Sequence, residues 1–201
     1  GTVSGTETIT ITPNTNTSIY DLAGNAAQTS TTTGAVTLLV TAGPNITNVT
    51  SSKTDGSYKA GDIILIQVTF SALVNVTGTP VLTLETGTTD QPVSYASGSG
   101  STTLVFTYTV QSGDISVDLD YTATTALALS GGTIKNAGGT DAVLTLATPG
   151  ASGSLGVNKS LIIDTTAPTV TNVTSSSANG NYKAGNTISL TVTFSESVTM
   201  V

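Results

Sequence analysis

The sequence of 201 residues contains no cysteine, histidine, tryptophan or arginine. Without histidine and cysteine, the chain lacks the commonest general base, thiolate nucleophiles, disulfides and the usual imidazole and thiolate metal ligands. A metal ion would therefore have to be bound through oxygen atoms alone.

Charge is also scarce. Charged residues make up 8% of the chain, with 5 lysines against 12 acidic residues and a net charge of −7, whereas about a quarter of an ordinary domain is charged. There is no basic footprint for nucleic acid or anionic lipid, and no apolar run reaches the ~18 residues of a membrane span. We therefore expect neither nucleic acid binding nor membrane insertion.

The first residue is not methionine, and no charged segment followed by an apolar one opens the chain. We therefore expect a mature segment or a piece of a longer protein. An acidic composition without cysteine, rich in threonine, serine, glycine and asparagine, suits an extracellular protein on a bacterial or archaeal cell surface.

What the chain does contain is β-branched residues, since 43 residues are threonine, and these favour strands. Apolar side chains recur at every second position in 64–70, 104–110 and 115–121, the period of a strand with one face on a core. Turn signals lie between such runs, including Asp55-Gly56 as a hairpin turn and the segment 97–101, SGSGS. No 11-residue window has helical periodicity. This pattern predicts an all-β fold, a Greek-key, Ig-like β-sandwich.

The chain also repeats itself. Residues 44–76, PNITNVTSSKTDGSYKAGDIILIQVTFSALVNV, align without gaps on 168–200, with 18 of 33 positions identical at an offset of 124. A weaker echo links VTLLVTAGP at 36–44 to SLIIDTTAP at 160–168. We therefore expect tandem repeats of about 124 residues: the C-terminal part of one repeat in 1–43, a complete repeat in 44–167 and the N-terminal part of the next in 168–201.

This succession of motifs resembles the tandem Ig-like repeats of very large bacterial surface proteins, including those named for a cyanobacterial swimming-associated protein. The motifs that carry the resemblance are VTGTPVLTLETG, GSGSTTLVFTYTV, GDISVDLDY, ALALSGGTIKNAGG and GSLGVNKSLIIDTTAP. The resemblance implies extracellular stalks, adhesins or filaments in which copies act as spacers, and related adhesin repeats often hold calcium near their joints.

Asp118 and Asp120 in VDLDY form the sharpest candidate site. A spacing of two on a strand would put both carboxylates on one outward face, roughly 7 Å apart, where they could donate to calcium if a loop supplied further oxygen. The alternative is a solvated strand face.

Asp164 and Asp62 are the other calcium candidates. Asp164 lies at the seam LIIDTTAP, where it could be a ligand at a joint or a turn former ahead of Pro168. The first seam has Thr41 or Ala42 at that place, which argues against calcium at every joint. Asp62 becomes Asn186 in the next copy, and its alternative role is that of a turn residue before a strand.

We expect no enzymatic activity, because a glycosidase-like pair of carboxylates would need aromatic side chains that hold the sugar rings, and only 4% of the residues are aromatic. Three other functions remain open. The first function is a structural spacer in a surface adhesin, with neighbouring repeats as its partners. The second is a filament subunit in which incomplete ends, 1–43 and 165–201, complement one another by strand addition. The third is a carbohydrate-binding module that contacts a surface glycan or cell.

Overall fold

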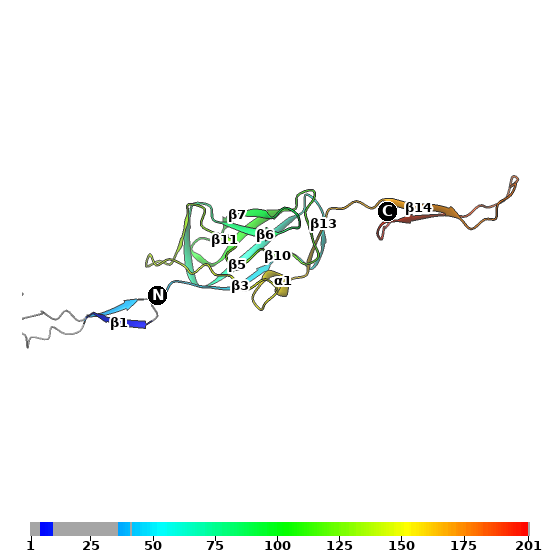
Figure 1. The fold of residues 1–201 in the computed structure, drawn as a ribbon. Coiled ribbons are helices and arrows are strands. Elements are labelled where there is room, and N and C mark those ends of the chain that lie inside the picture. Colours follow the sequence, from blue (N-terminus) through cyan, green and yellow to red (C-terminus); the bar gives the residue numbers. More distant parts are fainter. Residues whose placement is uncertain (1–4, 10–35, 41, 201) are drawn as a thin grey trace, which may run out of the picture.

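The computed structural model describes residues 5–9, 36–40 and 42–200, and the protein is all-β within them (Figure 1). The elements are β1 (Gly5–Ile9), β2 (Val36–Val40), β3 (Ile46–Ser51), β4 (Gly56–Tyr58), β5 (Ile63–Thr77), β6 (Val81–Glu85), β7 (Gln91–Ser97), β8 (Ser101–Thr109), β9 (Ile115–Ser116), β10 (Asp120–Tyr121), β11 (Leu127–Ala128), β12 (Thr133–Lys135), α1 (Leu155–Asn158), β13 (Leu161–Asp164), β14 (Val170–Ser175) and β15 (Leu190–Phe194). In the described part of the chain, no helix is long and apolar enough to cross a membrane.

Most strands of the central unit, residues 42–167, belong to one curled sheet. Its order is β10-β6-β7-β8-β5-β12, with β3 also paired to β5 and β11 to β6. The long strand β5 holds the sheet together: it pairs antiparallel with β3 and β8 along its first part and with β12 at its end, after a shift of register between Thr69 and Val74. Such an irregularity bends a strand and increases its twist, which allows β5 to pair with β3 and β8 along its first part and with β12 at its end.

A smaller sheet, β4-β13-β9, completes the unit. The strands of a Greek-key sandwich are mainly antiparallel, but β13 pairs parallel with β4, with Leu161 opposite Gly56 and Ile163 opposite Tyr58. Asp55-Gly56 is consequently not a hairpin turn, because β3 pairs with β5 and β4 with β13, and the chain crosses from one sheet to the other at this point. The hairpin prediction for Asp55-Gly56 is wrong for this reason.

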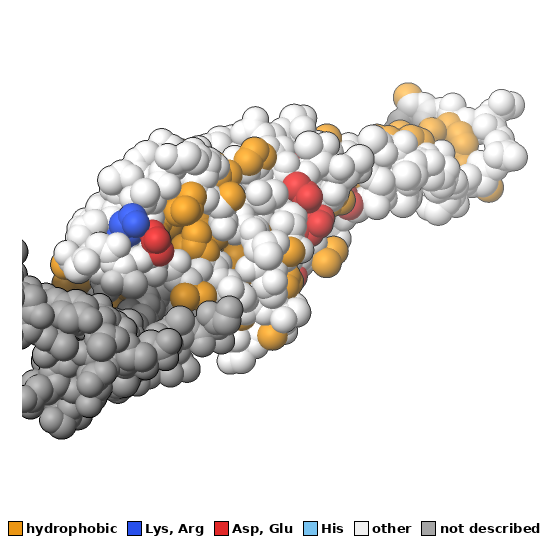
Figure 2. All heavy atoms as spheres, turned by 60° about the vertical axis from the view of Figure 1, so that its left-hand side comes forward, with side chains coloured by type: hydrophobic (Ala, Val, Ile, Leu, Met, Phe, Trp, Pro, Cys, Tyr) orange, Lys and Arg blue, Asp and Glu red, His pale blue; other side chains and the backbone are white. Residues whose placement is uncertain are grey.

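One core fills the space that the sheets enclose, an arrangement consistent with a β-sandwich. The alternating residues of β5 and β8 supply its centre, as the period of two predicted. The largest fully buried side chains are Tyr108, Tyr121, Phe106, Ile64, Ile66, Leu82, Leu84, Leu104, Leu119, Ile134, Leu155 and Leu161. The surface carries few charges: the face in Figure 2 is mostly white, with hydroxyl, amide and backbone atoms between small apolar patches.

The hairpin β14–β15 has the same pairing as β3–β5 at the offset of 124 residues. Val170 lies opposite Phe194 as Ile46 lies opposite Phe70, and both ladders shift register at the same place. The surroundings differ, however. Every residue of β14 and β15 is exposed, and Leu190 is 71% exposed whereas Ile66, its counterpart in β5, is fully buried. Among the described residues, nothing therefore provides a core for this second hairpin.

In the N-terminal segment, only β2 can be compared with the second sequence similarity, that of residues 36–44 to residues 160–168. β2 spans Val36–Val40, at the same offset from the segment that contains β13, and it pairs antiparallel with β1, which does not lie at that offset from β9, the antiparallel neighbour of β13. Most of the segment 1–43, predicted to be the end of a preceding repeat, lies outside the described residues.

Candidate calcium sites

Asp118 lies on a bend and Asp120 begins the next strand, β10, so the two do not lie on one continuous strand. The predicted strand 115–121 is divided into β9 and β10, because the chain bends at 117–118. Val117 is therefore 89% exposed while Leu119 is fully buried, against the predicted alternation. Asp118 is exposed as expected, but the prediction of a shared outward face is wrong for Asp120, which is only 9% exposed.

The loop that precedes α1 explains why Asp120 turns inward. Asp120 Oδ2 accepts a hydrogen bond from the backbone nitrogen of Gly150 at 3.0 Å, and Oδ1 accepts one from Tyr121 at 2.9 Å. Gly156 lies directly against the pair: a Cβ there would be 3.0 Å from Asp120 Oδ2 and 3.4 Å from Asp118 Oδ2. The two carboxylates thus converge on one small space that only a glycine leaves open.

The electrostatics of this space disfavour two negative charges. The pKa of Asp118 is raised, first by desolvation and then by repulsion from Asp120, and repulsion from Asp55 adds to it, while a backbone hydrogen bond from Leu161 opposes the shift. A bound cation would relieve this repulsion. However, calcium takes 6 to 8 oxygens, and no group of three or more acidic residues within the described ranges could hold a metal ion. Calcium at Asp118 and Asp120 stays a prediction that needs carbonyl and water ligands.

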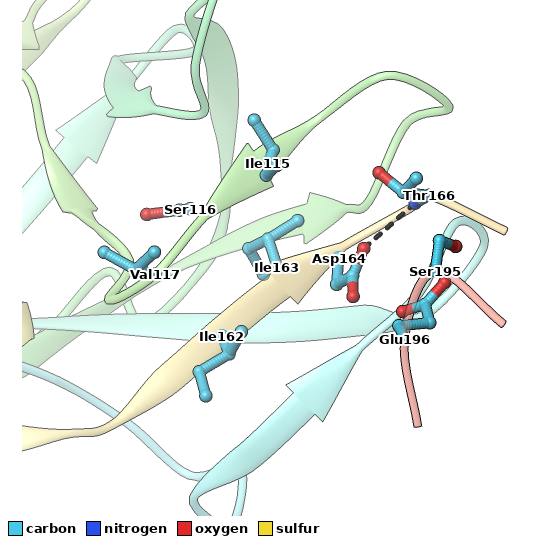
Figure 3. Close-up of a pocket in the computed structure, with 9 residues that line it drawn as sticks. All are labelled: Ile115, Ser116, Val117, Ile162, Ile163, Asp164, Thr166, Ser195 and Glu196. Atoms are coloured by element: carbon cyan, nitrogen blue, oxygen red, sulfur yellow. Dashed lines mark hydrogen bonds between the residues drawn. The ribbon is translucent and has the colours of Figure 1, made fainter. Parts of the chain in front are cut away.

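Asp164 forms a turn at the seam. Its Oδ1 accepts a hydrogen bond from the backbone nitrogen of Thr166 at 3.0 Å (Figure 3). The next residue is anchored as well: Thr165 Oγ1 donates to the carbonyl of Asp114 at 2.9 Å and accepts from the nitrogen of Gly113 at 3.0 Å. The observed hydrogen bond shows Asp164 in the turn role, and calcium binding at Asp164 stays a prediction.

A shallow cavity of about 350 Å³ lies at this seam. Figure 3 shows Ile115, Val117 and Ile162 on one side of it and Asp164 with the side chains of Ser195 and Glu196 on the other. Ser195 and Glu196 directly follow β15, so the cavity joins the central unit to the hairpin β14–β15. Glu196 Oε1 is buried there without a hydrogen-bond partner.

Asp62 closes a tight turn between β4 and β5. Its Oδ2 accepts from the nitrogen of Lys59 at 2.9 Å, and its own nitrogen donates to the carbonyl of Lys59 at 3.1 Å. Asn186 and Lys183 make the same two bonds at 2.9 and 3.0 Å. The amide serves as well as the carboxylate, so the position requires an oxygen acceptor and no charge.

Asp114 is the most completely bonded carboxylate of the unit, and no sequence motif singled it out. It is 3% exposed and accepts hydrogen bonds from Tyr108 Oη at 2.6 Å, Gln91 Nε2 at 2.8 Å and the nitrogen of Gln111 at 2.8 Å. Burial, followed by this hydrogen bond to Asp114, raises the pKa of Tyr108. The available signal was Tyr108 itself, since a tyrosine at a core position needs a partner for its hydroxyl.

Within the described residues, these features define an all-β protein with curled, mainly antiparallel sheets, two converging carboxylates beside one bend and a turn-forming aspartate at a seam. Comparison of the sequence with protein-family models finds no match, and comparisons with curated proteins and with solved structures find none either.

Proposed function

We propose that the chain is a structural spacer in a large extracellular surface adhesin, built from tandem Ig-like repeats of about 124 residues. One observation carries this proposal: the hairpin β14–β15 reproduces the register of β3–β5, including its irregularity, at the offset of the sequence repeat. A second hairpin of the same design, with all its strand residues exposed, is what the start of a further repeat would look like before the rest of that repeat covers it.

Side-chain hydrogen bonds support the equivalence of the two hairpins. Ser51 Oγ donates to the carbonyl of Leu65 at 2.8 Å, and Ser175 Oγ donates to that of Ser189 at 2.7 Å. The central unit has its own core and is followed by a short seam that contains Pro168, so the stability of each unit is local and the reach of the chain increases with the number of copies.

The spacer function assigns the candidate sites a supporting role. Calcium bound near a joint would stiffen it by tying two units together, and the ligands considered for it are Asp118, Asp120 and Asp164. The partners are neighbouring repeats and the site of action is the cell surface.

A filament subunit is the second proposal, and the exposed apolar face of β14–β15 favours it. Val173, Leu190 and Val192 are 47–71% exposed, and an unpaired hairpin with one apolar face is a template for strand addition from another molecule. In this alternative, residues 1–43 of a neighbouring molecule would complement residues 165–201.

Size-exclusion chromatography and electron microscopy of the 201-residue chain separate the two proposals. The spacer predicts monomers, whereas the filament predicts regular fibres. The matched variants are Leu190→Lys, on the apolar face of β15, and Thr191→Lys, on the opposite face of the same strand. Fibres that Leu190→Lys abolishes and Thr191→Lys preserves would refute the spacer in favour of the filament.

A glycan array with and without calcium tests the third function, carbohydrate binding, which stays a hypothesis. A spacer should bind no glycan reproducibly. Calcium-dependent binding that Asp118→Asn removes would instead assign the paired carboxylates to a sugar site.

Labelling of intact cells with antibodies against the chain tests the extracellular location, and labelling that needs permeabilised cells would contradict it.

A further inference from the structure

The chain enters and leaves the central unit at opposite ends. Figure 1 shows the segment before β3 reaching one end of the unit and the segment after β13 leaving from the other. Any tension along a chain of such units would therefore enter through residues 42–58 and leave through residues 158–167. The entering segment is also held by the antiparallel pairing of β3 with β5, but the contacts between the entering and the leaving segment are the ones that join the two loaded ends directly.

The backbone contacts between the two segments are parallel. β13 pairs parallel with β4 from Gly56 to Tyr58, and the nitrogen of Gly56 donates to the carbonyl of Ser160 at 3.0 Å. When two parallel neighbours are pulled from their outer ends, they slide along each other. All the hydrogen bonds between them are then loaded together, whereas strands pulled from the same end open one bond at a time.

Side chains fasten the same two segments. Asn158 Nδ2 donates to Asn48 Oδ1 at 2.7 Å and to the carbonyl of Val49 at 2.8 Å. Lys159 Nζ lies 2.6 Å from Asp55 Oδ1, and the Lys159 side chain is only 18% exposed. We call the contacts of Asn158 and of Lys159 with the entering segment, together with the β4–β13 pair, the terminal clamp.

We propose that the terminal clamp makes the central unit a load-bearing element that resists stretching between its two ends. This inference rests on the proposed spacer function and adds to it: the unit holds its length under tension in addition to separating what lies at its two sides. The pairs of the clamp join residues 104 or more positions apart in the sequence, so breaking them releases nearly the whole unit at once.

Single-molecule force spectroscopy of the 201-residue chain tests the inference, with handles at its two termini. We expect one main unfolding event that lengthens the chain by about 40 nm, the extended length of residues 44–167 less their folded length. Asn158→Ala removes two hydrogen bonds of the clamp and should raise the unfolding rate at constant force about tenfold.

The two ion pairs of the unit provide a matched control. Asp55→Asn breaks the pair with Lys159 inside the clamp, and Asp141→Asn breaks the 2.7 Å pair with Lys135 outside it. Lys159 is 18% exposed and Lys135 is 37% exposed, so the loss of unfolding force in each variant is compared with the shift of its own equilibrium midpoint in denaturant. Only Asp55→Asn should lower the unfolding force. An equal loss of force in both variants would overturn the inference.

The loading geometry provides a second control. The chain has no cysteine, so Thr102→Cys gives a single thiol handle near the entry end, because its neighbour Thr103 lies opposite Thr69, which lies opposite Asn48 of β3. Pulling between the N-terminus and this handle bypasses the clamp and should unfold the unit at a clearly lower force. Equal forces in both geometries would overturn the inference while leaving a passive spacer intact. Sugar binding or intracellular labelling would refute the spacer function without changing the force measurement.

Discussion

Replacing Tyr108 with phenylalanine isolates a single buried hydrogen bond. Tyr108 is 1% exposed, and its hydroxyl donates to Asp114 Oδ2 at 2.6 Å. The substitution keeps the ring and opens no large cavity, while Asp114 retains the bonds from Gln91 and Gln111. The stability lost is therefore that of one bond to a buried carboxylate.

The size of the loss follows from the charge of the acceptor. A hydrogen bond to a charged group contributes about 1.5–3 kcal/mol, against about 0.5–1.5 kcal/mol for a neutral one. Tyr121 provides the neutral comparison, because its hydroxyl donates to the carbonyl of Ala147 at 2.7 Å and its ring is also 1% exposed. Tyr108→Phe should therefore destabilise the unit about twice as much as Tyr121→Phe.

Equilibrium unfolding in urea measures both variants. With a denaturant dependence of about 1–3 kcal/mol/M, Tyr108→Phe should lower the midpoint by about 1 M at an unchanged slope. A smaller loss for Tyr108→Phe than for Tyr121→Phe would refute the assignment of the charged bond.

The pH dependence provides an independent check. The pKa of Tyr108 is raised, first by burial and then by Asp114, and burial raises the pKa of Tyr121 to about 12. Both groups are neutral in the folded and unfolded states below pH ~10, so their contribution is fully present there. Above pH ~10 the unfolded chain ionises first, and stability must fall. Each phenylalanine variant should reduce this alkaline fall, as urea midpoints between pH 8 and 11 would show.

Three further substitutions test the remaining geometry. Asp118→Asn should raise the thermal midpoint slightly at neutral pH, because the raised pKa of this carboxyl means that its contribution to stability is present below pH ~4 and lost as the pH rises through the folded-state pKa. The variant should also abolish any rise in the thermal midpoint that calcium produces in the parent chain, and a rise that persists would place calcium elsewhere. Ile66→Ala should destabilise the unit by about 2–5 kcal/mol, whereas Leu190→Ala, its counterpart at the offset of 124, should leave urea unfolding unchanged within about 0.5 kcal/mol; equal losses would show that the second hairpin has a core. Gly132→Ala should cost about 2 kcal/mol or more in the same assay, since its Cβ would lie 2.2 Å from a backbone carbonyl oxygen, and a neutral result would contradict the backbone path there.

Local patterns predicted much of the fold. The period of two in β5 and β8 identified these strands because one face of each lies on the core along the whole run. The segment SGSGS was predicted as a turn, and Gly98 at φ 107° and Gly100 at φ 82° confirm it between β7 and β8. The all-β prediction is confirmed, while the Greek-key, Ig-like topology stays a prediction.

Non-local contacts limited the prediction elsewhere. The strand 115–121 was predicted as continuous because its apolar residues alternate, but the inward position of Asp120 depends on Gly150, which lies 30 residues away. The helix α1 has four residues, too few for a periodicity search, and its only local signal is Ser154, whose side chain caps it. The spacing in the sequence therefore identified Asp118 and Asp120 as a candidate pair, but the orientation of their side chains could not be predicted from it.

The equal register of β3–β5 and β14–β15 has a consequence for folding fidelity. In the proposed tandem arrangement, neighbouring units this similar can exchange equivalent hairpins while they fold, a characteristic misassembly of repeat proteins. The differences between the hairpins would then discriminate right from wrong pairing. Asn179 occupies the place of Asp55, so a central unit that took up the second hairpin would lose the ion pair with Lys159. The Asp55–Lys159 ion pair, which forms with the correct hairpin, would thus be absent when the wrong hairpin is taken up.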